Sequence, residues 1–236
     1  MANTLFLRLE GLMQSWGERG RWSVRDSASE PTKSGVVGLL ACALGINRDH
    51  ELEELSRSLQ FSVRCDREGA AREDYHTVGG GYRAPQLLQA DGKSKGKIGS
   101  AHTELTYRTY LYDASFLVAI QSDDRQINRL AHAIQNPQWV LFLGRKSCPP
   151  SRPIYEGMNR YDSCQAALED WPWYCPEATT ETTIDVRAVL ESSRLEGGVQ
   201  RRHELISRNR RVYGPVYMRD IRLKINIIPD FPVQLG

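Results

Sequence analysis

A basic, glycine-rich segment between two strand-like runs constrains the fold of this chain most strongly. Residues 92–99 alternate glycine and lysine with little else, a composition that cannot build a core. The preceding run 74–78 and the following runs 106–112 and 115–120 have the alternating or apolar patterns of β-strands. We therefore expect an excursion that leaves the core, either as a solvated loop or as a projection that orders on a polyanion.

Removing this excursion leaves a β-α-β-β-α-β order of elements. Strands are expected at 5–10, 60–65, 115–120 and 139–143, and the main helices at 31–44 and 125–135. Thr32 or Ser34 can cap the first helix, and Gly45 is expected to end it. The order predicts an α+β fold with a ferredoxin-like (RRM-like) domain over residues 1–150, followed by a β-rich C-terminal region over 151–236.

Composition narrows the class of protein. The chain has 236 residues, of which 40% are hydrophobic, enough for a real core. Net charge is only +2, but residues 186–224 carry ten Arg or Lys against four Asp or Glu, a local excess that suits a phosphate backbone and also occurs on solvated faces. The five cysteines form no C-x-x-C pair, so neither a zinc site nor a disulfide framework is expected, and free thiols suit a reducing cytoplasm. We expect no metal and no cofactor. No apolar run is long enough to span a membrane, so we expect no membrane partner.

Three places could contact nucleic acid. Trp16 follows the first strand and either closes the edge of the core or stacks on a base. Lys33 lies beside the free N–H groups at the start of a helix, which is a possible phosphate site, although the motif of a nucleotide-hydrolysing P-loop is absent. Gly144-Arg145-Lys146-Ser147 is a short cationic turn that suits either a phosphate contact or solvent.

Six blocks of the sequence carry a resemblance to a known family. They are 9–17 (Leu-Glu-Gly-Leu-Met-Gln-Ser-Trp-Gly), 31–35 (Pro-Thr-Lys-Ser-Gly), 60–66 (Gln-Phe-Ser-Val-Arg-Cys-Asp), 74–78 (Asp-Tyr-His-Thr-Val), 110–116 (Tyr-Leu-Tyr-Asp-Ala-Ser-Phe) and 143–149 (Leu-Gly-Arg-Lys-Ser-Cys-Pro). In order and spacing they resemble the CasD family, RAMP-superfamily subunits of the type I-E CRISPR Cascade surveillance complex. The resemblance runs from about residue 5 to residue 150.

The resemblance implies a non-catalytic subunit that binds the 5′ handle of CRISPR RNA (crRNA) in antiviral defence. It places a β-hairpin thumb at about 78–110, which reaches the backbone subunit of the complex, and it implies a contact with the large subunit. Target DNA is then met only through the complex. The residues expected to bind RNA are Gln14, Trp16, Lys33, Ser34, His76, Arg83, His102, Arg108, Arg145, Lys146 and Ser147.

Two other functions stay open on the residues alone. Some relatives in the wider family cut CRISPR repeat RNA without metal, and His76, His102 and Tyr107 are candidate groups for such an endoribonuclease, with Lys97 steadying the phosphorane charge. The resemblance implies no catalysis, because type I-E systems carry a separate nuclease. A scaffold without RNA contact would leave the basic loops unexplained.

Overall fold

A computed structural model describes residues 1–18, 23–79, 91, 93, 103–175, 182–207, 210 and 212–229. Its elements are β1 (Ala2–Gln14), β2 (Val24–Arg25), α1 (Lys33–Leu44), α2 (Asp49–Ser58), β3 (Gln60–Arg67), β4 (Ala70–Gly79), β5 (Thr103–Gln121), α3 (Asp124–Gln135), β6 (Tyr155–Tyr161), α4 (Cys164–Asp170), β7 (Trp173–Cys175), β8 (Thr183–Ser192), the 3-10 helix η1 (Arg194–Glu196), β9 (Val199–Ser207) and β10 (Val212–Pro229).

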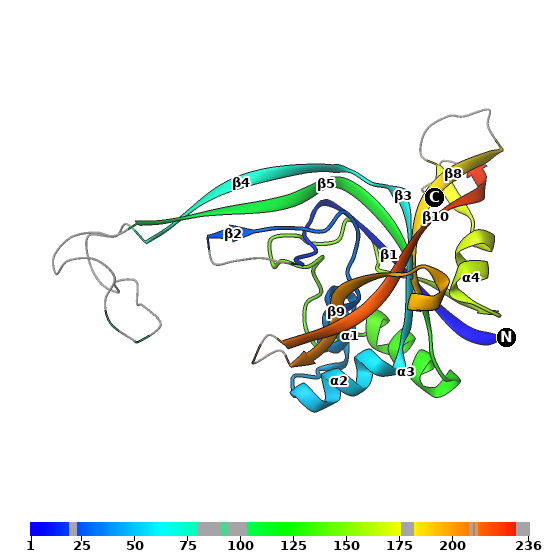
Figure 1. The fold of residues 1–236 in the computed structure, drawn as a ribbon. Coiled ribbons are helices and arrows are strands. Elements are labelled where there is room, and N and C mark those ends of the chain that lie inside the picture. The colour runs from blue at the N-terminus through cyan, green and yellow to red at the C-terminus, as the bar shows by residue number, and fades with distance from the viewer. Residues whose placement is uncertain are drawn as a thin grey trace, which may run out of the picture.

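One large sheet, mainly antiparallel, organises the molecule (Figure 1). Its strand order is β6-β1-β5-β3-β8-β10-β7, with β2 and β4 paired to β5 and β9 paired to β10. Strand β8 pairs with β3 from Ser62↔Leu190 to Cys65↔Arg187, so the C-terminal region extends the sheet that the N-terminal strands begin. The chain is thus a mixed α/β fold, with helices packed on a continuous sheet.

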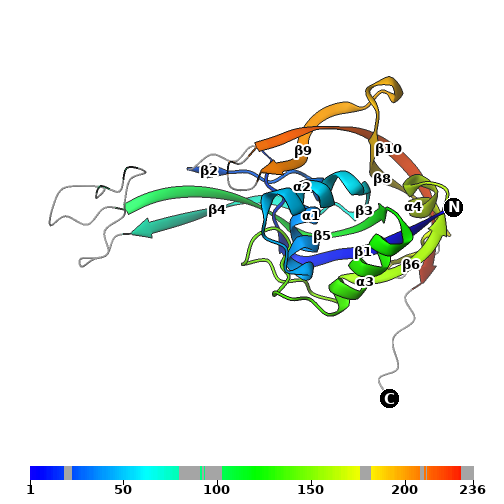
Figure 2. The ribbon, with the colours of Figure 1, turned by 90° about the horizontal axis from the view of Figure 1, so that it is seen from below.

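The two faces of the sheet hold separate apolar clusters, because side chains alternate along each strand. Leu7 and Leu9 of β1 join Val118 of β5 in the larger cluster, under α1, α2 and α3. Phe6 and Leu117 point the other way and pack with Leu168 of α4 and residues of β8 and β10. Figure 2 shows α1, α2 and α3 together along one side of the sheet. Among the described residues, no helix has the length and apolar composition needed to cross a bilayer.

Helix α1 begins and ends at the residues that the sequence predicts. The Thr32 hydroxyl accepts a hydrogen bond from the Gly35 N–H at 3.2 Å, which satisfies one of the free donors of the first turn. Gly45 ends the helix with φ +72°, in the left-handed region that glycine adopts without strain. The predicted helix at 125–135 is also confirmed, as α3 with Asp123 as its cap.

The strand predicted at 139–143 is wrong. This segment is a loop, fixed to α1 where the Gln138 N–H donates to the Ala43 carbonyl at 2.9 Å, and closed where the Leu143 N–H donates to the Cys148 carbonyl at 2.7 Å. Leu143 is buried, while Trp139 and Val140 are 42% and 83% exposed. The sheet edge beside β1 is instead occupied by β6, with Leu5 opposite Met158.

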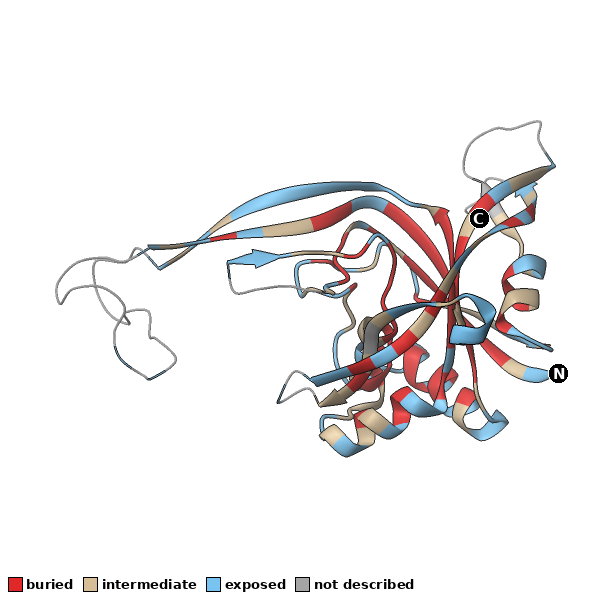
Figure 3. Ribbon diagram, in the orientation of Figure 1, coloured by how far each residue is buried: buried red, intermediate tan, exposed pale blue. Residues whose placement is uncertain are grey.

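Strands β4 and β5 form a long hairpin that projects from the body (Figure 3). Their pairing runs from Ala70↔Tyr112 to Gly79↔Thr103, so the hairpin starts ahead of the range 78–110 expected for a thumb. Its basic middle lies outside the described residues, apart from Asp91 and Lys93. On the other edge of β5, the two-residue strand β2 pairs in parallel, with Val24 opposite Tyr107 and Arg25 opposite Arg108.

Candidate nucleic-acid interface

Cationic side chains meet at the base of the hairpin. Arg25 of β2 and Arg108 of β5 are register partners and therefore share one face of the hairpin. Tyr110 lies on the same face two residues further along β5, and its hydroxyl is 3.4 Å from the Ser147 Oγ in the turn after α3. Lys146 and Ser147 of that turn are exposed. The basic surface is thus assembled from three segments that are distant in sequence.

Arg145 holds this assembly together. One terminal nitrogen donates to the Thr109 carbonyl at 2.9 Å, and the other to the carbonyls of Arg25 and Asp26 at 3.0 and 3.2 Å. Its guanidinium also lies 4.6 Å from the centre of the Tyr110 ring, a favourable cation–π distance. Arg145 therefore fixes the turn to the hairpin. Lys146 is the cation of this turn that is exposed to solvent.

The two faces of the hairpin differ in chemistry. Asp74 is opposite Arg108 in the β4–β5 register, and the His76 Nε2 lies 2.7 Å from the Asp74 Oδ2, so the cationic face also carries a carboxylate. The opposite face presents Tyr75 and Tyr107, which are 55% and 38% exposed and meet edge to face with centroids 5.8 Å apart. Such rings offer surfaces on which unpaired bases stack.

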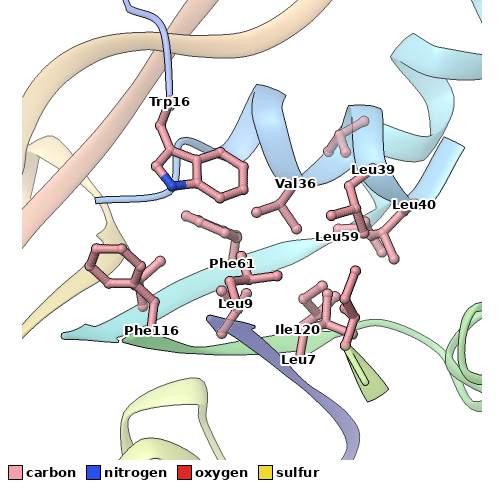
Figure 4. Close-up of a cluster of buried hydrophobic side chains, with 14 of the residues drawn as sticks. Leu7, Leu9, Trp16, Val36, Leu39, Leu40, Leu59, Phe61, Phe116 and Ile120 are labelled. Carbon is pink, nitrogen blue, oxygen red and sulfur yellow. The ribbon is translucent and has the colours of Figure 1, made fainter. Parts of the chain in front are cut away.

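Trp16 and Gln14 belong to the core, so the prediction that they contact RNA is not supported. The Trp16 side chain is 1% exposed and lies over α1 beside Val36 (Figure 4). Its indole N–H donates to the Gln14 Oε1 at 3.1 Å, and the Gln14 amide donates to the carbonyls of Leu9 and Ala114. A Cβ at Gly35 would lie 2.8 Å from the indole ring, so this glycine lets the helix approach the tryptophan. Neither side chain is accessible to a base.

Lys33 is also buried, contrary to the prediction of a phosphate contact. Its side chain is 3% exposed, and its ammonium lies 2.8 Å from the Glu191 Oε1 and 3.5 Å from the Glu204 Oε2. Burial raises the pKa of Glu191, and the nearby Lys33 charge acts in the opposite direction. The Lys33 charge is thus used to join α1 to β8 and β9, while Ser34 beside it is half-buried.

The arginines of the C-terminal region are partly neutralised. The buried Glu30 carboxylate pairs with Arg187 at 3.1 Å and with Arg201 at 2.6 Å. Burial alone would raise the pKa of Glu30, but the Ser29 hydrogen bond and the two arginine charges lower it. Both arginines also pair with Asp220. The local excess of cations in the sequence therefore overstates the basic surface of this region.

The remaining predicted residues, Arg83 and His102, lie outside the described residues, as does Lys97. Sequence reasoning missed Arg25 and Tyr75 as parts of this surface. The alternation along 74–78 could have indicated Tyr75, whereas nothing local reveals that β2 pairs with β5. In the part of the chain that the structure describes, no three His, Cys, Asp or Glu side chains gather as a metal site would require.

Comparison with known proteins gives this arrangement its context. The family model for the CRISPR-associated protein (Cas_Cas5) matches residues 4–219, nearly the whole chain. The chain belongs to this CRISPR-associated Cas5 family. Over 181 residues it is 37% identical to the CRISPR system Cascade subunit CasD of Escherichia coli (strain K12), with 71% of this chain and 76% of that protein covered.

Solved structures agree with this membership of the Cas5 family. A chain of a CRISPR RNA-guided surveillance complex is 28% identical and superposes with a TM-score of 0.78, covering 98% of this chain and 96% of that chain. A crystal structure described as a Cas protein is 31% identical, with a TM-score of 0.70 and coverage of 97% and 99%. The structural similarity therefore includes the C-terminal strands. The short sequence blocks that resemble the family end before these strands, at about residue 150.

Gly144 of the cationic turn packs against Ser15, the residue after β1, so its replacement in this Cas5-family chain is expected to disturb the site. Gly144 has φ +87°, and a Cβ there would lie 1.7 Å from the Ser15 carbonyl oxygen. Gly144→Ala should therefore lower the free energy of unfolding by about 2–3 kcal/mol, measured by urea titration. Gly197→Ala is the matched control, because Gly197 has φ +81° but nothing within 4 Å of its Cβ; it should lose about 1 kcal/mol. Equal losses would contradict a role for the Ser15 contact.

Proposed function

We propose that this chain is the non-catalytic subunit of a type I-E Cascade complex that binds the 5′ handle of crRNA. The observation that carries the proposal is the cationic base of the hairpin, formed by Arg25, Arg108 and Lys146 in a chain of the Cas5 family. Cations of this kind position RNA phosphates, and exposed aromatic rings stack on splayed bases. The similarity to the Cascade subunit CasD supports the assignment to such a complex.

In this proposal, strands β6-β1-β5-β3 and helices α1 and α3 are the ferredoxin-like unit that carries the RNA site. Their spatial order and antiparallel pairing support this reading. The β4–β5 hairpin is the thumb, which reaches the backbone subunit, and another part of the surface meets the large subunit. Target DNA is contacted only through the assembled complex, in the cytoplasm and without a cofactor.

Lys146→Ala tests the phosphate contact most simply. Lys146 is exposed and makes no hydrogen bond or ion pair with another described residue, so folding should be unchanged. Loss of one phosphate contact should weaken binding of repeat RNA several-fold and flatten the plot of log affinity against log salt by about one unit. Arg129→Ala, an exposed cation on α3, is the control and should change neither quantity. An unaltered salt slope for Lys146→Ala would remove this residue from the RNA path.

The alternative, a metal-independent endoribonuclease, is less well supported by the hairpin geometry. His76 is opposite Thr106 in the β4–β5 register, so it lies on the face opposite to the neighbouring Tyr107. A histidine and a tyrosine on opposite faces cannot act together on one phosphate. The purified chain should therefore leave repeat RNA intact with or without divalent metal, and cleavage abolished by His76→Ala would favour the nuclease.

A further inference from the structure

A hollow beside the cationic turn is lined mainly by apolar residues. It lies between α1 and the loop 138–144, has a volume of about 340 Å³, and is lined by Gly38, Cys42, Ile46, Trp139, Phe142 and Leu205, among others. This volume is at the lower end of the range for small-ligand sites. The hollow is separate from the hairpin faces described above, although Gly144 belongs to its wall and Arg145 follows directly.

Gly38 is the feature of this hollow that packing does not explain. It lies within α1, where glycine is less favourable than alanine for helix formation. Gly35, one turn earlier, is explained by the close approach of Trp16, but a Cβ built at Gly38 would meet nothing within 4 Å. The absent side chain leaves the hollow open along the helix backbone. A glycine in such a place suits the close approach of a ligand.

The other wall supplies aromatic surface, and the cationic turn continues from it. The Trp139 side chain is 42% exposed and lines the hollow with the half-buried Phe142. Gly144 belongs to the wall, and the exposed Lys146 follows it by two residues. Aromatic surface beside a cation is the combination that holds a single-stranded nucleotide, with the base stacked and the phosphate paired.

We propose that this hollow takes one unpaired base of the bound RNA, stacked against Trp139 and packed on Gly38, with its phosphate beside Lys146. The proposal rests on the proposed function and adds a base-sized site on the body of the subunit, away from the hairpin. An unpaired base fits better than an aliphatic side chain of a partner protein, because Gly144 of the wall belongs to the cationic turn that carries Arg145 and the exposed Lys146.

Filling the hollow from the helix side tests the proposal. Gly38→Leu should fold normally, because leucine favours helix and its Cβ meets nothing. We expect it to weaken binding of repeat RNA roughly tenfold, the loss typical of one stacked base, without changing the salt slope, because no phosphate contact is removed. Asn128→Leu, on the exposed side of α3, places the same residue on another helix and should leave binding unchanged.

Single abasic substitutions at each position of the repeat RNA identify the base. Removing the base at one position should weaken binding to the wild-type chain roughly tenfold. The same abasic RNA should bind Gly38→Leu no more weakly than intact RNA does. Trp139→Ala should give the same result as Gly38→Leu and replaces it if the leucine variant is unstable. If abasic RNAs lose the same affinity with the wild-type chain and with both variants, the proposal is overturned. It is also overturned if the variants bind RNA normally but fail to assemble into the complex, which would indicate that a protein occupies the hollow. If the wild-type chain itself binds repeat and unrelated RNA equally, the proposed function fails instead.

Discussion

Arg64→Ala is expected to lower the free energy of unfolding by about 3–5 kcal/mol, the usual loss when one partner of a buried charge network is removed. Arg64 is fully buried and pairs with Asp66, which also binds the buried Arg8. Its guanidinium donates to the carbonyls of Leu168 and Trp171, at the C-terminal end of α4. Alanine would leave these acceptors unsatisfied within the sheet–helix interface.

The loss should concentrate on α4, because Arg64 supplies the cation at that helix end. Denaturant titration gives the global change, and reaction of the buried Cys164 thiol with a thiol reagent reports opening of α4. Arg57→Ala is the matched control: Arg57 is 66% exposed and pairs with Glu53 on the surface of α2, so its loss should stay within about 0.5 kcal/mol. A change below about 1 kcal/mol for Arg64→Ala would show that the network contributes little to stability.

Lys33→Met should also lower stability, by about 3 kcal/mol at neutral pH, because it leaves Glu191 and Glu204 without their shared cation. The lysine stem is replaced by an apolar chain of similar length, so the loss reports the charge. Salt dependence of RNA binding should not change, since the ammonium is buried. Lys224→Met on the exposed side of β10 should leave stability within about 0.5 kcal/mol of wild type.

The Lys33→Met loss should depend on pH. Because burial raises the pKa of Glu191 above that of an exposed glutamate, the folded state keeps a proton over a pH range in which the unfolded chain has already lost it. This group therefore contributes less stability as pH rises from about 4.5 through its folded pKa. Removing the Lys33 charge raises that pKa further, so the variant should lose more stability at pH 7.5 than at pH 5. Adding Glu191→Gln to Lys33→Met should recover part of the loss, and a pH-independent loss would contradict this account.

The sequence predicts elements well where the signal is local. Thr32 and Gly45 mark the ends of α1 because capping depends on residues within one turn. The apolar run 139–143 predicts a strand but forms a loop, since a short apolar run does not reveal whether it pairs with a strand or covers a helix. The helix that it covers is set by contacts such as that of Gln138 with Ala43, far away along the chain.

The candidate site was less predictable for the same reason. Lys33 looks like a free cation beside a helix N-terminus, but its partner Glu191 is supplied by β8, 158 residues later. Trp16 looks exposed among polar neighbours until Gly35 and Gln14 are seen around it. Lys146 is exposed, as both a phosphate contact and a solvated turn require, because Arg145 fixes the turn and leaves the next side chain in solvent.

Site-resolved crosslinking of the assembled complex tests the central claim most directly. A photoreactive amino acid placed at Lys146, with Arg129 as the control position, would be activated in complexes purified with their RNA, and the attached RNA would be sequenced. The account predicts crosslinks from Lys146 to the repeat-derived 5′ handle and none above background from Arg129. Crosslinks from Lys146 spread evenly along the RNA, or their absence from an intact complex, would contradict handle binding at the base of the hairpin.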